Sequence, residues 1–238
     1  MNPAPPPVRH RELWSLREDT AVDLPDGGGV LLSGVWGEVR LADPGRTVRE
    51  ALRRMSYGPV SLRNIVTDFP DHDTPASARL SPASAGLSRA LAELQWLLIR
   101  SIDLDGTGLL LSVVPLTGDA GDAALHPRTP DPELALVLAP LTELQWNPQG
   151  VRLEAPQGCY RAEVHHPAAV TLVRRLDRPR TPTELAEHMH PDLPAATVRT
   201  LLAFLVATGL VTVAPAKAID GPHSMASVRH ERRGSWPK

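Results

Sequence analysis

The clearest pattern of apolar and polar positions lies between Ala168 and Val213, in the last third of the chain. Three consecutive short segments place apolar residues at helical spacing, and proline-containing breaks separate them at Asp177–Arg180 and Pro191–Pro194. Gly209 follows the third segment, where a helix commonly ends in a left-handed residue. The apolar residues after Gly209 predict a short strand. This part of the chain is therefore expected to form three helices followed by a strand.

Three residues between 181 and 184 mark the start of the second of these helices. Thr181 can cap free amide groups, Pro182 fits the first turn without losing a hydrogen bond, and Glu184 suits the positive helix end. Three short helices that end in a strand, with further strands in front of them, are typical of a winged helix. A winged helix is a small architecture that is commonly used for binding.

The first half of the chain predicts a similar order of elements. The expected elements are strands at 12–18, 30–33, 35–41 and 109–114, and helices at 47–55, 61–66 and 87–102. Thr47 is the expected cap of the first helix. Residues 67–86 are rich in Asp, Pro, Ser and Ala, and they predict a surface insertion.

A short sequence match supports an internal repeat. Leu52-Arg53-Arg54-Met55 matches Val173-Arg174-Arg175-Leu176, and Trp14 and Trp146 stand at the same stage of their strands. We interpret this as a duplicated β-β-β-α-α-α-β unit, which predicts an α+β fold of tandem winged-helix-like units. The expected divisions are a disordered arm at 1–9, a first unit at 10–116, a linker at 117–133, a second unit at 134–215 and a loose tail at 216–238.

Composition narrows the class of protein. The chain has 238 residues and a formal net charge of −2, so no overall field favours nucleic acid or acidic lipid. Its one cysteine excludes an internal disulfide framework and suits a reducing, cytoplasmic compartment. No apolar run approaches the roughly 20 residues of a membrane span. Only two Phe and two Tyr are present, which argues against an aromatic surface for stacking bases.

Several segments between about residues 10 and 215 carry a resemblance to a known family. They are Leu13-Trp14-Ser15-Leu16-Arg17-Glu18-Asp19-Thr20, Trp36-Gly37, Leu52-Arg53-Arg54-Met55, Gly58-Pro59-Val60-Ser61-Leu62 with Asn64, Ser101-Ile102, Leu110-Leu111-Ser112-Val113-Val114-Pro115 and His165-His166-Pro167. Together they resemble the N-terminal region of actinobacterial SagB-type peptide dehydrogenases. The resemblance implies a role in the biosynthesis of thiazole- and oxazole-modified ribosomal peptides, and winged-helix units of the PqqD-like, peptide-recognition kind.

The resemblance also implies where the redox chemistry lies. SagB-type dehydrogenases oxidise azolines with FMN, which is held by a nitroreductase-like domain after the region matched here. Residues 220–238 are too short for such a domain, so no catalytic or cofactor-binding residue is expected in this chain, and FMN is expected in a missing domain or a partner. The implied partners are a precursor or leader peptide and a flavin-dependent dehydrogenase or cyclodehydratase. The alternative is that the chain is itself a fragment or subunit of an FMN-dependent peptide dehydrogenase.

Residue types that commonly carry chemistry do not converge along the sequence. The candidate metal ligands are Cys159, His165, His166, His188, His190 and Asp192. Their spacing matches no familiar zinc site, which favours solvated or capping histidines and no metal. Strand alternation puts Cys159 and His165 on opposite faces, so a structural cysteine is favoured over a thiol nucleophile. The glycines at 27–29 and 106–108 are expected in hairpin turns, and Asp71 and Asp73 on a polar surface.

A winged helix also raises DNA binding as a separate hypothesis. Its recognition helix would then present Arg, Lys, Asn or Gln to base edges. Residues 195–208 offer only Arg199 and threonines among apolar residues. This composition argues against a DNA-binding regulator.

The preferred hypothesis is that an extended peptide adds to the edge of a three-stranded sheet, beside the third helix. In the second unit the edge would be Gly158–His165, facing Thr197–Phe204. In the first unit it would be Gly37–Leu41, beside Leu87–Gln95. The expected peptide-binding residues are Tyr160, Arg161, Glu163, His165, Arg199 and Ala203. Two alternatives stay open, namely that both edges are buried against each other and that the chain is a scaffold that forms a homodimer.

Overall fold

The computed structural model describes residues 10–25, 28–70, 74, 78–105, 108–116 and 125–215, which form a mixed α+β fold, as the sequence predicts. Several predictions concern residues outside these ranges. They are the arm at 1–9, the tail at 216–238, the first part of the linker at 117–124, the turn glycines Gly27 and Gly106, and the carboxylates Asp71 and Asp73.

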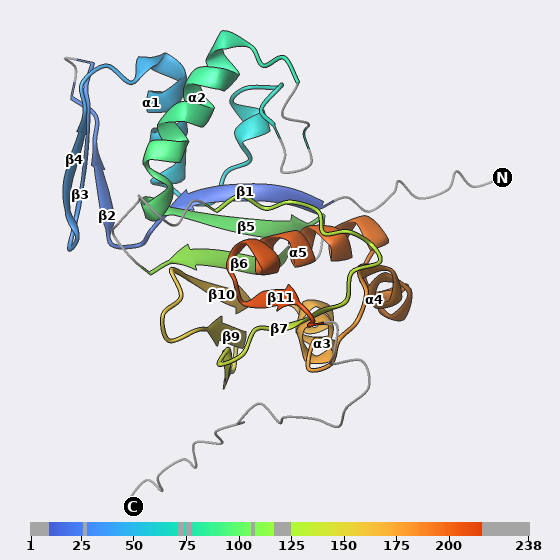
Figure 1. The fold of residues 1–238 in the computed structure, drawn as a ribbon. Coiled ribbons are helices and arrows are strands. Elements are labelled where there is room, and N and C mark those ends of the chain that lie inside the picture. Colours follow the sequence, from blue (N-terminus) through green and yellow to red (C-terminus); the bar gives the residue numbers. More distant parts are fainter. Residues whose placement is uncertain are drawn as a thin grey trace, which may run out of the picture.

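A six-stranded antiparallel sheet forms the centre of the molecule, with the strand order β1-β5-β6-β10-β9-β8 (Figure 1). The strands are β1 (His10–Leu16), β5 (Leu98–Leu104), β6 (Gly108–Pro115), β10 (Tyr160–Val164), β9 (Gly150–Glu154) and β8 (Glu143–Asn147). The first three strands come from the first half of the chain and the last three from the second half. One sheet therefore runs through both halves.

The two halves of this sheet meet where β6 pairs with β10. The pairing runs from Tyr160 opposite Pro115 to Val164 opposite Leu111. On its other side β10 pairs with β9, so β10 is an interior strand. The expected open edge at Gly158–His165 is therefore wrong, because β6 already supplies the partner strand that a peptide would have to provide.

The first half also builds a second, smaller sheet covered by two helices. Its strands are β2 (Thr20–Asp23), β3 (Val30–Gly34) and β4 (Gly37–Leu41), and the helices are α1 (Gly45–Met55) and α2 (Pro82–Glu93). Short 3₁₀ turns lie at Leu62–Asn64 and Gln95–Leu97. Burying aliphatic side chains is the main stabilising contribution in such a core. Those buried here come from β3, α1 and α2, and they include Leu32, Leu52, Leu87 and Leu91.

The structure corrects three predictions for this half. The helix expected at 87–102 ends at Glu93, and residues 98–104 form β5 instead. Apolar residues at 98, 102 and 104 suit either a helix or a strand, and pairing with β1 and β6 on both sides decides for the strand. The first helix begins before its expected cap Thr47, with Pro44 at the N-cap position and no side-chain cap. Part of the expected insertion at 67–86 belongs to α2, which Ser81 caps through a hydrogen bond from the Ser84 amide.

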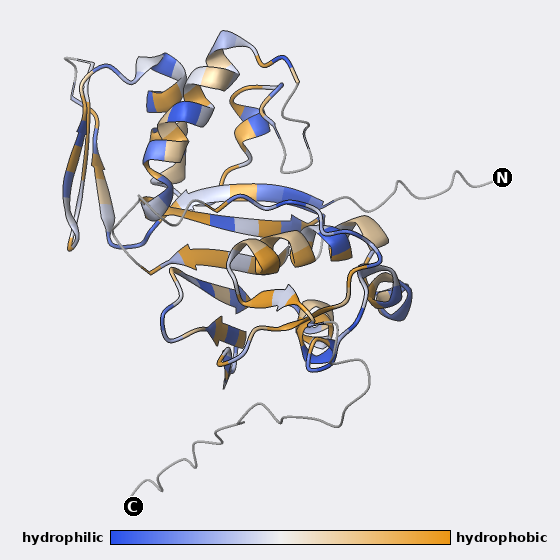
Figure 2. Ribbon diagram, viewed as in Figure 1, coloured by the Kyte–Doolittle hydropathy of each residue, from blue (hydrophilic) through white to orange (hydrophobic). Residues whose placement is uncertain are grey.

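The second half follows the prediction closely. Its helices are α3 (Pro167–Arg175), α4 (Pro182–Met189) and α5 (Ala195–Ala207), and β11 (Val211–Val213) follows Gly209. Thr181 and Glu184 form a capping box at the start of α4, in which the backbone amide of each residue donates to the side-chain oxygen of the other. The final strand β11 pairs with β7 (Leu136–Leu138) in a separate two-stranded sheet. Helix α5 is buried along most of its length, and Figure 2 shows hydrophobic residues along α5 and the neighbouring strand β6.

Arg100 of β5 ties the two halves together. Its guanidinium lies 4.5 Å from the ring centroid of Trp14 on β1 and 4.8 Å from that of Phe204 on α5. Its Nε donates to Glu12 at 2.6 Å, and Nη1 donates to the Leu125 carbonyl at 2.9 Å. The Arg100 and Glu12 side chains are only 12% and 9% exposed, so this ion pair lies almost entirely inside the protein.

Among the described helices, none has the length and apolar character that crossing a membrane requires.

Candidate binding groove

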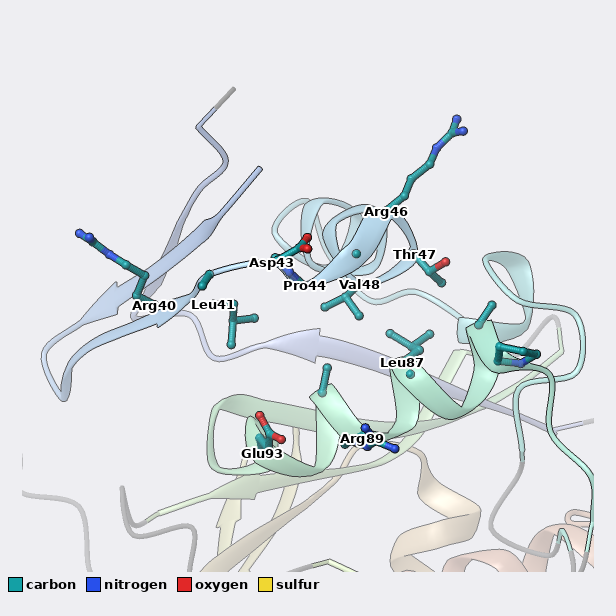
Figure 3. Close-up of a pocket in the computed structure, with 16 residues that line it drawn as sticks. Arg40, Leu41, Asp43, Pro44, Arg46, Thr47, Val48, Leu87, Arg89 and Glu93 are labelled. Atoms are coloured by element: carbon teal, nitrogen blue, oxygen red, sulfur yellow. The ribbon is translucent and has the colours of Figure 1, made fainter. Parts of the chain in front are cut away.

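An open strand edge lies in the smaller sheet. β4 is the outer strand of the order β2-β3-β4, and within the described residues it pairs only with β3. A groove of about 540 Å³ opens beside it, lined by residues 40–48 and by α2 residues between 82 and 93 (Figure 3). The groove therefore has three walls, formed by the end of β4, the first turn of α1 and one face of α2.

Apolar side chains form the floor of the groove. Val48 of α1 and Leu87 of α2 are both buried, and their side chains lie toward one another across the space between the two helices (Figure 3). Leu41 and Ala90, which are partly buried against the same core, extend this surface. An apolar side chain placed here would lose contact with water, which favours binding.

Charged side chains surround this apolar surface. Arg40, Arg46 and Arg89 line the groove together with Asp43 and Glu93. Figure 3 shows the Arg40 and Arg46 side chains extending away from the inner surface, toward the rim. The arrangement can hold an apolar group inside and polar or charged groups at its edges.

Packing behind the groove fixes the position of β4. The indole of Trp36, in the turn between β3 and β4, meets Trp96 edge-on, with ring centroids 4.6 Å apart at 87°. Arg49 of α1 donates hydrogen bonds to the carbonyl groups of Gly29 and Pro25, which flank the start of β3. These contacts hold the β3–β4 hairpin against the helices, so the open edge of β4 has a fixed position.

The groove corresponds in part to the sequence prediction for the first unit. The edge Gly37–Leu41 was expected beside Leu87–Gln95, and β4 does lie beside the α2 part of that range. The sequence reasoning missed the third wall, residues 43–48 at the start of α1. The Asp43-Pro44-Gly45 turn, followed by a helix without a side-chain cap, was the available signal for an accessible helix start.

The six residues expected to bind peptide in the second half do not meet at an open edge. Tyr160 and Ala203 are buried, and burial raises the pKa of the Tyr160 hydroxyl. Arg161 and Glu163 form an ion pair at 3.0 Å on the interior strand β10. Arg199 is exposed on α5. Since β10 already has neighbours on both sides, these residues offer no free backbone for an added strand.

His165 belongs to a chain of side-chain hydrogen bonds instead. Its Nε2 lies 2.9 Å from Ser112 Oγ, which lies 2.9 Å from Ser101 Oγ. Burial lowers the pKa of the His165 imidazole, so the neutral form is favoured. Both serines are buried, and the chain joins β5 and β6 to the end of β10. We interpret it as a structural contact across the junction of the two halves.

The other candidate ligands are distributed over separate helix ends and a loop. His166 Nδ1 accepts a hydrogen bond from the Ala168 amide and so caps α3. His188 Nδ1 lies 2.6 Å from the Glu184 carbonyl oxygen, and Cys159 is a half-buried free thiol. Within the described ranges, no three His, Cys, Asp or Glu side chains come together in a way that could hold a metal ion.

No protein-family model matches the chain, and no curated protein matches it either. The function proposed below therefore rests on the geometry of the groove.

Proposed function

We propose that this chain binds an extended peptide, and that the peptide adds a strand to the open edge of β4 while its side chains enter the groove beside α2. The observation that carries this proposal is the coincidence of an unpaired strand edge with an apolar groove. Added-strand recognition uses both features, since backbone hydrogen bonds give affinity and pockets for alternate side chains give selectivity.

The order of elements supports a recognition module of this kind. Strands β2-β3-β4, helix α1, the turn at Leu62–Asn64 and helix α2 follow one another, as β8-β9-β10 and α3-α4-α5 do. We interpret the two runs as tandem winged-helix-like units, in line with the sequence repeat. In this interpretation the third strand of the first unit, β4, keeps its outer edge free, whereas β6 pairs with the corresponding strand β10 of the second.

The dimensions of the groove fit a peptide side chain or two. A volume of about 540 Å³ lies within the range of roughly 300–1,000 Å³ that is typical of small-ligand pockets. Aliphatic side chains form the floor of the groove, and charged side chains surround it. Binding, with chemistry carried out elsewhere, is therefore the function that suits it best.

The resemblance to SagB-type dehydrogenases gives this proposal a biological setting. The peptide would be the leader or precursor peptide of a thiazole- or oxazole-modified product. A flavin-dependent dehydrogenase or cyclodehydratase would act on the peptide held here, and FMN would belong to that partner or to a further domain. We propose a cytoplasmic site of action on the same basis.

Two measurements test the proposal. A displayed library of short random peptides is selected on the purified chain, and enriched peptides are titrated by fluorescence anisotropy. Hydrogen exchange is then compared with and without peptide. Saturable binding, with new protection of residues 37–41 and slower exchange at the start of α1, is the expected result. Absence of saturable binding, or protection confined to β8, would contradict it.

A matched pair of variants locates the site. Ala90→Trp places a large side chain in the groove and should abolish binding, since Ala90 lines it. Ala196→Trp makes the same change on an exposed part of α5 and should leave binding unchanged. Equal loss in both variants would show that the groove is not where the peptide binds.

A further inference from the structure

We infer that the peptide held at β4 is acidic, with carboxylate side chains next to an apolar anchor residue. This inference rests on the proposed function and specifies the class of peptide. It is drawn from the charges at the rim of the groove and from the periodicity of an added strand.

The three arginines at the rim lack carboxylate partners within the described chain. Arg40, Arg46 and Arg89 are all exposed, and in the described part of the chain none of them forms an ion pair or a hydrogen bond through its side chain. Arg53 and Arg54 of α1 differ in this respect, because both donate to Glu50. Figure 3 shows the Arg40 and Arg46 side chains extending outward from the groove, so their guanidinium groups can meet the parts of a bound peptide that project beyond it, and carboxylates are their preferred partners.

The nearby acidic residues do not cancel this positive charge. Asp43 and Glu93 also line the groove, against three arginines. Helix α1, whose first turn forms one wall, contains four arginines and one glutamate, and its first turn has no acidic residue. The positive end of the α1 dipole adds to the same sign. The chain as a whole has a net charge of −2, so the positive charge at this wall is a local feature.

Strand geometry then sets the spacing within the peptide. Side chains alternate between the two faces of a strand, so residues one position apart in an added strand face opposite ways. On β4 itself, Leu41 lines the groove and packs against the core, whereas Arg40 is exposed. A peptide that pairs with β4 would place an apolar residue toward Val48 and Leu87. The residues on either side of it would face Arg40, where carboxylates are favoured.

The test uses three fluorescein-labelled peptides of equal length. One alternates leucine with glutamate, the second alternates leucine with glutamine, and the third alternates leucine with lysine. Anisotropy titrations at low and at moderate salt compare them on the full chain. The glutamate peptide should bind about twofold to tenfold more tightly than the glutamine peptide, because one or two exposed ion pairs contribute about 0.2–1 kcal/mol each. This advantage should shrink as salt is raised.

Charge reversal provides the matched control. Arg40→Glu, Arg46→Glu and Arg89→Glu should each weaken binding of the glutamate peptide, and the triple variant should prefer the lysine peptide. Arg199→Glu reverses an equally exposed arginine on α5 and should change nothing. All four positions are on the surface, so folding should be retained, and circular dichroism checks this.

The outcomes separate this inference from the proposed function. Equal, salt-independent binding of all three peptides, still abolished by Ala90→Trp, would overturn the acidic preference and leave peptide binding intact. Binding of none of the three, together with an empty library selection, would overturn both. Preference for glutamate that survives the triple charge reversal would place the selectivity elsewhere and overturn the assignment to these arginines.

Discussion

Replacing Arg100 with methionine should destabilise the whole protein. The substitution keeps an unbranched apolar side chain between Trp14 and Phe204 but leaves Glu12 without its partner at 2.6 Å. Breaking a buried ion pair from one side costs about 3–5 kcal/mol. The Glu12 side chain is 9% exposed, so water can offset little of this cost.

A loss of about 4 kcal/mol should be readily measured. For a chain of this length each kcal/mol lowers the melting temperature by about 2–4 °C, so a decrease on the order of 10 °C is expected. Urea unfolding followed by tryptophan fluorescence gives the free energy of unfolding directly. Because Arg100 contacts groups from both halves, the unchanged chain should unfold in one transition.

Two further variants show whether the buried charge is the cause. Arg11→Met removes ion pairs with Asp103 and Asp105 in which the arginine side chain is 56% exposed, and it should cost less than about 1 kcal/mol. The double variant Glu12→Leu with Arg100→Met removes both charges and should recover much of the lost stability. A cost below about 1 kcal/mol for Arg100→Met alone, or a double variant no better than the single one, would refute the reasoning.

Single positions give three other predictions. Gly150→Ala should lower the free energy of unfolding in urea by at least about 1–3 kcal/mol, because the φ angle of Gly150 is +146° and an added Cβ would lie 1.9 Å from the Val164 carbonyl oxygen. As a control, an added Cβ at Gly86 meets nothing within 4 Å, so Gly86→Ala should be neutral or stabilising. The hydrogen bonds from Arg53 and Arg54 lower the pKa of Glu50 to about 2, so its NMR titration should move toward the ordinary 4.5 in Arg53→Gln. The stability that Glu50 contributes in the native chain should be fully present above pH 4.5 and be lost progressively as pH falls from 4.5 to about 2. Burial lowers the pKa of His165, so its ring should titrate below 6.5, and the stability gained from its neutral form should be lost as pH falls below 6.5; a titration at or above 6.5 would contradict the burial argument.

Local signals in the sequence were sufficient for the second-half helices. The Thr181–Glu184 capping box, the prolines before α4 and α5 and Gly209 act within a few residues of one another, so their effect does not depend on distant parts of the chain. The same applies to the hairpin strands β3 and β4. Their alternation and short turn predicted the element that carries the candidate groove.

Signals that depend on distant partners could not be extracted in the same way. Residues 98–104 became a strand because β1 and β6 lie on either side of them, although the leucine spacing also suits a helix. Strand β10 is an interior strand because it pairs with β6, which is far away in the sequence. An edge strand and an interior strand can have similar alternation, so the sequence alone could not show which of the two expected edges, 37–41 or 158–165, stays open.

The pairing of β6 with β10 has a consequence for stoichiometry. A tandem repeat would ordinarily offer two equivalent places for a ligand, with avidity toward paired targets. Here β6 of the first half pairs with β10 of the second half, and the outer strand β4 keeps its edge beside the groove. On the proposed function, each chain would bind one peptide at β4. The second half of the chain would support the first half through the shared sheet and would bind no peptide at β10.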